Sequence, residues 1–320
     1  MPLKAQTIQI LPAPEVRFPS VTDSNSPAIW KGGQLVLFNA MGTPFRSHGA
    51  DQLKLGDTTQ VNFGPGQPTP LWIESAWVDS DGTVFAWYHH EPPGLCPGTS
   101  LTAPKIGAMI SHDGGLSFQD LGFVLVSGGP IDCKAQNGYF AGGNGDFAVV
   151  LDGGKQFFYF FFSNYGGDLA SQGVAVARMP FASRFSPVGA LTKYYKGGFT
   201  EPGIGGKVTP IYPARVSWAS AQADAFWGPS IHWNTAIKKY VMLLNHACCG
   251  PYWPQEGVYL SISPDLAVPA HWPTPTKILS GVGWYPQVLG EGANETDRRA
   301  GARSRLYVYG DSKWELVVSP

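Results

Sequence analysis

The chain has 320 residues, among them 40 glycines and 28 prolines, and it is 13% aromatic but only 14% charged. This composition excludes a protein of long charged helices and favours a turn-rich β-sheet protein. A formal net charge of −1 argues against nucleic acid or an anionic membrane as partner, and no apolar run reaches the roughly 20 residues that span a bilayer. The N-terminal residues begin no signal peptide, so we expect a soluble protein, either cytoplasmic or exported with its signal removed.

A strand–turn–strand unit recurs five times along the chain. In the clearest copy, the link Asp152-Gly153-Gly154-Lys155 joins a small apolar run to an almost wholly aromatic one, which is typical of a β-hairpin with a buried second strand. The five copies span residues 26–39, 74–88, 142–163, 228–244 and 285–309. Further strands are predicted at 105–111, 173–178 and 257–262.

Three or more strands per unit indicate the blades of a propeller, in which radial packing leaves only short sheet edges. We therefore predict an all-β fold, a five-bladed β-propeller forming one domain over residues 1–320, with blades starting near residues 23, 72, 144, 226 and 284. The fifth blade has only the run 314–318 left to complete it, so the alternating segment 5–10 is expected to close that blade. Residues 188–215 are interpreted as an insertion between blades three and four.

Chain direction separates the loops at the two ends of such a propeller. The short hairpins lie at one end, and the longer connections that leave the second strands share the other end, where function is expected. Candidate substrate-binding residues in these connections are Arg46, His48, His89, His246 and Glu256. Arg46 with His48 would suit an anionic group, whereas an ion pair between Arg46 and Asp51 is the structural alternative.

Alignment of the five first strands brings Ser26, Glu74, Asp146, Gly228 and Tyr285 to equivalent places near the central axis. Two of the five are carboxylates, which are costly to bury unless they are solvated, paired or metal-bound, so Glu74 and Asp146 are the leading catalytic candidates. Their structural alternative is hydrogen bonding between blades. Asp23, three residues before Ser26, is a third catalytic candidate, with capping of a turn as its alternative role.

Aromatic and amide side chains near the same places favour a sugar as ligand. Flat rings stack on the C–H faces of sugars, and amides bind hydroxyl groups. The candidates are Trp72, Trp227, Trp284 and Tyr285 for stacking, with Asn25 and Asn144 for hydrogen bonding. The structural alternative is that a tryptophan in a blade is more often a filler between sheets.

The arrangement resembles the five-bladed glycosidases of the arabinanase and β-xylosidase kind. In those enzymes a second Asp opens the third blade and adjusts the pKa of the acid, a role that Asp146 matches. The sequence departs from the family at two positions, because Ser26 precedes Pro27 and Trp227 precedes Gly228-Pro229 where the family has Asp and Glu. The resemblance implies a glycoside hydrolase, with inversion favoured, whose acid and base come from Glu74, Asp23 or Glu256.

Two local features complete the pattern. Residues 111–118, which contain Asp113, resemble the Asp-box turn of sialidases, a structural turn that indicates a propeller and no activity. The four cysteines have no zinc spacing; Cys96 and Cys133 would pair in an exported protein and remain thiols in the cytoplasm.

Three hypotheses about function remain. The first is a glycoside hydrolase that uses a carboxylate pair on a small glycoside or oligosaccharide, without a cofactor. The second is a metal-dependent hydrolase of phosphoesters or lactones, with Ca²⁺ held by Glu74, Asp146, Asn25 and Asn144. The third is a carbohydrate-binding propeller without activity, which the strong differences among the five loops disfavour.

Overall fold

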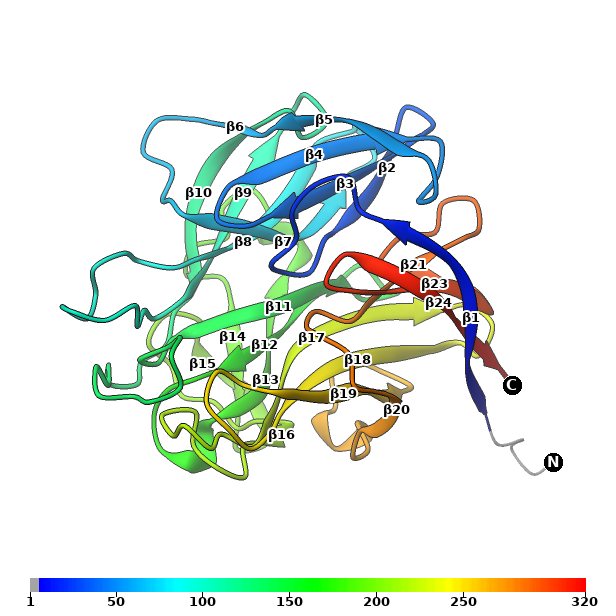
Figure 1. The fold of residues 1–320 in the computed structure, drawn as a ribbon. Coiled ribbons are helices and arrows are strands. Elements are labelled where there is room, and N and C mark those ends of the chain that lie inside the picture. Colours follow the sequence, from blue (N-terminus) through cyan, green and yellow to red (C-terminus); the bar gives the residue numbers. More distant parts are fainter. Residues whose placement is uncertain (1–5) are drawn as a thin grey trace.

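The computed structural model describes residues 6–320, which form five mainly antiparallel sheets around a central axis (Figure 1). The prediction of an all-β five-bladed propeller is confirmed. No helix within these residues is long and apolar enough to cross a bilayer. Three short 3-10 helices occur in the connections, and they are η1 (Leu169–Ser171), η2 (Phe181–Ser183) and η3 (Pro269–His271).

Each blade begins with an inner strand near the axis and continues outward through antiparallel neighbours. Blade I contains β2 (Ala28–Lys31), β3 (Gln34–Ala40), β4 (Pro44–Gly49) and β5 (Leu55–Gln60). Blade II contains β7 (Leu71–Val78), β8 (Val84–His90), β9 (Lys105–Ser111) and β10 (Ser117–Leu125), with β6 (Asn62–Phe63) at its outer edge. Blade III contains β11 (Asn144–Leu151), β12 (Phe157–Asn164), β13 (Gly173–Pro180), β14 (Thr192–Tyr195), β15 (Gly198–Pro202) and β16 (Tyr212–Pro213).

Blade IV contains β17 (Ala225–Asn234), β18 (Lys239–Ala247), β19 (Gln255–Ser263) and β20 (Thr276–Ser280), with β22 (Arg299–Ala300) beside β17. Blade V contains β21 (Gln287–Gly290), β23 (Arg303–Val308), β24 (Asp311–Ser319) and β1 (Thr7–Arg17). The N-terminal strand β1 pairs antiparallel with β24, so the predicted closure of the last blade is confirmed (Figure 1). Residue 5 of the predicted strand lies outside the described residues.

Two predicted connections differ from the structure. The segment after blade one was predicted as a loop, but residues 44–49 form β4, because its polar side chains find partners in neighbouring strands and hairpins. Residues 188–215 are not a separate insertion, since they contain β14, β15 and β16, the outer strands of blade III. Both errors concern polar outer strands, which lack the apolar pattern of the inner ones.

Apolar side chains from neighbouring blades fill the spaces between the sheets. Phe85 and Trp87 of blade II pack with Phe158 and Phe160 of blade III, and equivalent clusters join each successive pair of blades around the ring. Burial of such large rings stabilises each blade contact by a few kcal/mol per side chain. This closed set of contacts fixes the positions of the inner strands, which present residues to the axis.

Two disulfides occur in the connections. Cys96 pairs with Cys133, a pairing that the sequence left open, and this bond ties the β8–β9 connection to the β10–β11 connection. Cys248 pairs with Cys249 at the end of β18, a bond between neighbours that the sequence analysis did not predict. The first disulfide holds two long loops beside the carboxylates at the axis.

Candidate active site

Irregular pairing at the start of the inner strands turns carboxylates toward the axis. The pairing of β7 with β8 skips Glu74, and that of β11 with β12 skips Asp146, so each residue occupies a β-bulge. The pairing of β17 skips Gly228 in the same way. These residues are therefore equivalent, as the alignment predicted, and bulges of this kind commonly re-aim side chains at sites. Asp146 adopts the left-handed region with a φ of 40°.

Glu74 is almost fully buried and links two blades. Its Oε2 accepts a hydrogen bond of 2.7 Å from the backbone N–H of Phe147 in blade III, and its Oε1 lies 3.2 Å from His89 Nδ1. Glu74 thus makes the hydrogen bond between blades that was given above as its structural alternative. Such contacts hold the carboxylate in one orientation beside the axis.

His89, on β8, is the centre of the site. Its Nδ1 lies 3.2 Å from Glu74 and 3.2 Å from the backbone nitrogen of Asp146, and its Nε2 lies 3.2 Å from Glu91. Burial alone would lower the pKa of His89, but the contacts with Glu74 and Glu91 raise it well above its usual value. The imidazolium therefore partly balances the acids around it.

Asp146 is buried and accepts a hydrogen bond from the hydroxyl of Tyr165. Burial, together with the charge of Glu74, raises the pKa of Asp146 to about 7, while His89 and Tyr165 act in the opposite direction. A carboxyl group with this pKa is protonated below about pH 7 and ionised above it. Glu74 and Asp146 are each only 3% exposed, so neither carboxylate is open to solvent.

Two further carboxylates, Asp23 and Glu91, lie nearer to solvent. Both are partly exposed, and the side chain of Glu91 keeps 29% of its accessible surface. Burial, and then the charge of Glu91, raises the pKa of Asp23 to about 6, with His89 acting in the opposite direction. Glu91 and Tyr165 were not among the predicted site residues, although Glu91 follows His89 and His90 in a loop that chain direction had assigned to this end.

Most of the predicted stacking rings are packed into the protein. Trp227 is 1% exposed and donates through Nε1 to Gln255, and Tyr285 is 7% exposed beside it. Trp72 is 9% exposed, with its ring 5.4 Å from that of His89, and Trp284 is partly exposed. Trp284 is therefore the most accessible of the four predicted rings.

The two asparagines have structural partners. Asn25 Nδ2 donates to the backbone oxygens of Phe147 at 3.2 Å and Pro229 at 2.9 Å, which joins three blades at the axis. Asn144 donates to Asn164 at 2.7 Å, and its oxygen lies 3.4 Å from the ammonium group of Lys193. An ammonium group beside Asn144 disfavours a cation there. Both amides are thus engaged within the protein, and the calcium set of Glu74, Asp146, Asn25 and Asn144 stays a prediction.

A different set of possible metal ligands is present. One ligand atom each from Glu74, His89 and Asp146 lie within 4.8 Å of one another. Carboxylate oxygens and a neutral imidazole suit several divalent cations. The raised pKa of His89 opposes this use of the cluster, because a proton competes with a metal for the ring nitrogens.

The remaining predicted residues lie in other clusters. His246 lies between two carboxylates, 2.8 Å from Glu256 and 2.9 Å from Asp224, on blade IV. Arg46 lies on β4 and donates at 3.0 Å to the backbone oxygen of Gly114 in a blade II hairpin, rather than pairing with Asp51. His48 lies on the same strand, 3.9 Å from Asp57. None of these contacts is with the acids around His89.

The turn at residues 111–118 is held by its own side chains. Asp113 Oδ1 accepts hydrogen bonds of 3.0 Å from the backbone N–H groups of Leu116 and Ser117, and Ser111 Oγ accepts one of 2.9 Å from Gly115. These bonds satisfy the turn backbone. The Asp113 carboxylate therefore has a structural role in this turn.

Comparison with known proteins identifies the fold. No protein-family model and no curated protein sequence matches the chain. Among solved structures, the endo-arabinase of Bacteroides thetaiotaomicron is 10% identical, with a TM-score of 0.58 over 95% of this chain and 96% of that one. The arabinanase of Bacillus subtilis is 11% identical, with a TM-score of 0.51 over 95% of each chain. The exo-β-1,3-galactanase of Phanerochaete chrysosporium, solved with galactose, is 12% identical, with a TM-score of 0.52 over 95% of this chain and 64% of that one. The chain therefore has an arabinanase-like propeller fold.

Proposed function

We propose that this protein is a glycoside hydrolase that acts on an oligosaccharide or small glycoside at the loop end of the propeller axis. The observation that carries this proposal is the group of four carboxylates around His89, of which Asp23 and Glu91 are partly exposed and Glu74 and Asp146 are buried. The arabinanases and the galactanase with a similar fold support a sugar substrate. Paired carboxylates are the usual means of glycoside hydrolysis.

The catalytic roles of the four carboxylates are assigned from their exposure to solvent. Asp23, with a pKa of about 6, can carry a proton at a position that a substrate reaches, so it is proposed as the general acid. Glu91 is proposed as the second carboxylate, which acts on water or on the sugar. Glu74 and His89 orient Glu91, and Asp146 holds a proton behind them. The pair first predicted from sequence thus becomes a pair of positioning residues.

The test is hydrolysis of aryl arabinofuranosides, galactosides and xylosides by the wild-type protein and by Asp23→Asn and Glu91→Gln. Each variant should lower kcat by at least ~10², which is the usual contribution of one acid or base. Asp57→Asn is the matched control, because Asp57 is exposed on blade I and should change kcat little. Wild-type rates for Asp23→Asn or Glu91→Gln would contradict the roles, and no hydrolysis of any glycoside would contradict the function.

A metal-dependent hydrolase is the second candidate, and the close approach of Glu74, His89 and Asp146 favours it. In that case a bound cation would activate water, and a chelator would abolish activity that added Ca²⁺ restores. Under the glycosidase proposal, chelation leaves turnover unchanged. The same assay on a phosphoester and a lactone separates the two candidates.

A further inference from the structure

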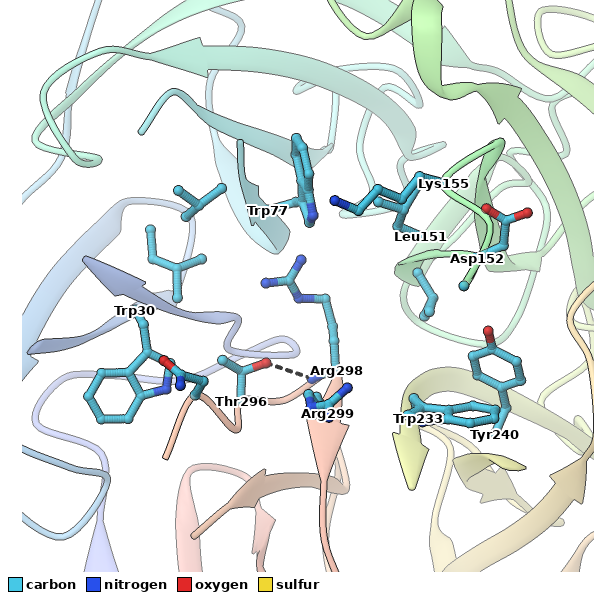
Figure 2. Close-up of a pocket in the computed structure, with 15 residues that line it drawn as sticks. Trp30, Trp77, Leu151, Asp152, Lys155, Trp233, Tyr240, Thr296, Arg298 and Arg299 are labelled. Atoms are coloured by element: carbon cyan, nitrogen blue, oxygen red, sulfur yellow. Dashed lines mark hydrogen bonds between the residues drawn. The ribbon is translucent and has the colours of Figure 1, made fainter. Parts of the chain in front are cut away.

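A cavity lies among the hairpins, at the end of the propeller opposite the acids around His89. It has a volume of about 500 Å³, within the usual size of small-ligand sites. Three tryptophans from the ends of inner strands line it, namely Trp30 on β2, Trp77 on β7 and Trp233 on β17 (Figure 2). Each is partly exposed, unlike the buried Trp227 near the other end.

The link between β21 and β23 forms one wall of this cavity and is held rigidly. Trp30 Nε1 donates at 2.7 Å to the backbone oxygen of Glu295, and Ala28 N donates at 2.8 Å to Asp297 Oδ1. Trp233 N donates at 2.9 Å to the backbone oxygen of Arg298. These bonds fix the backbone that carries Arg298. A ligand would therefore meet a site that is already formed.

The guanidinium group of Arg298 has unused hydrogen-bonding capacity. Within residues 6–320 its Nε has no hydrogen-bond partner, its distance to Asp297 Oδ1 is 3.8 Å, and Nη2 lies 3.5 Å from the backbone oxygen of Ala28. An arginine offers five N–H donors, which favours a ligand with anionic oxygens. Figure 2 shows this guanidinium group extending into the cavity.

Lys155, in the β11–β12 hairpin, extends into the same cavity, and Arg299 also lines it, so both add positive charge beside Arg298 (Figure 2). The carboxylate that also lines the cavity, Asp152, is engaged by its own turn, because its Oδ1 accepts hydrogen bonds from Gln156 N at 2.6 Å and Phe157 N at 3.2 Å. The cations are thus available to a ligand. Aromatic faces beside cations suit a sugar ring that carries an acidic group.

We propose that this hairpin-end cavity binds an acidic saccharide, with a carboxylate or sulfate ester on Arg298 and Lys155 and the sugar ring against the tryptophans. The site is separate from the acids around His89 and requires no chemistry there. Uronates and sulfated sugars both fit this proposal, since both present anionic oxygens to the same two side chains.

The test is calorimetric titration of the full chain with trigalacturonate, a sulfated galactose trisaccharide, neutral galactotriose and inorganic sulfate. At least one acidic saccharide should bind, and neutral galactotriose and sulfate should bind at least tenfold more weakly. Lys155→Ala and Arg298→Gln should each weaken binding about tenfold or more, which is the usual effect of losing a charge-assisted hydrogen bond. Trigalacturonate and the sulfated sugar identify which acidic group the site prefers.

Two controls locate the ligand. Lys134→Ala removes the same charge from an exposed loop outside the cavity, and Asp23→Asn alters the other end of the axis; both should leave binding unchanged. Lys155 is exposed, so its variant tests the proposal even if Arg298→Gln fails to fold. Equal binding of neutral and acidic sugars, full affinity in Lys155→Ala, or loss of binding in Asp23→Asn would overturn the proposal, as would no binding of either acidic sugar.

Discussion

Ionisation of the buried Asp146 carboxyl group should lower the stability of the folded protein. Its pKa of about 7 lies above the usual carboxyl value near 3.9, so the folded protein holds this proton more tightly than the unfolded chain does. The contribution of Asp146 to the free energy of unfolding should therefore fall as pH rises from about 4 to about 7 and level off above that. The raised pKa of His89 acts in the same direction, since its stabilising charge is lost as pH rises through its folded value.

Asp146→Asn should flatten this pH dependence, because the amide keeps an oxygen for Tyr165 and cannot ionise. The expected difference between wild type and variant is on the order of a few kcal/mol between pH 4 and pH 8. Urea unfolding at several pH values measures it. Asp57→Asn should run parallel to the wild type, and a similarly parallel curve for Asp146→Asn would refute the assigned cause.

The pKa of Asp23 should depend on the charge of Glu91. The pKa of Asp23 is raised to about 6 by burial, by Glu91 and by Glu74, so Glu91→Gln removes one of these causes and should lower that pKa. Carboxyl NMR titration of Asp23 in both proteins measures the shift directly, without dependence on turnover. An unchanged or higher pKa in Glu91→Gln would mean that the two carboxylates do not interact.

Closure of the propeller ring depends on strand β1. Ile8 and Ile10 pack against the cluster between blades IV and V, and β1 covers the edge of β24. Deletion of residues 1–10 should therefore lower stability by at least ~2 kcal/mol and broaden the melting transition, since it removes apolar packing and exposes a strand edge. Deletion of residues 1–5, before β1 begins, is the control. A melting curve unchanged by the longer deletion would contradict closure by β1.

The same elements show what sequence can and cannot predict. The inner hairpins were predictable because Gly and Asp mark their turns and apolar runs mark their strands, and strand register alone made Glu74 and Asp146 equivalent. Strand β4 was missed because a polar outer strand looks like a loop. Asn144 lies in the predicted place but contacts Lys193, since register locates a residue without showing which partners its side chain will find.

The two ends of the propeller carry different kinds of side chains. Acids and His89 gather where the long connections meet, whereas Arg298, Lys155 and three tryptophans gather among the hairpins. The closed ring of blade contacts keeps these ends apart, so changes at one end should reach the other only through global unfolding.

Asp81→Ala tests this separation at the hairpin end. Asp81 is exposed in the β7–β8 turn, where its Oδ1 accepts a hydrogen bond of 2.8 Å from Thr83 N. Loss of that bond should cost about 1 kcal/mol and lower Tm by a few degrees at most, while kcat for the best glycoside stays within about twofold of wild type. The matched change at the loop end, Glu91→Gln, should have the reverse pattern, with kcat lost and Tm little changed. If Asp81→Ala loses turnover while its circular dichroism and Tm stay normal, the reaction takes place among the hairpins, and the assignment of the two ends must be exchanged.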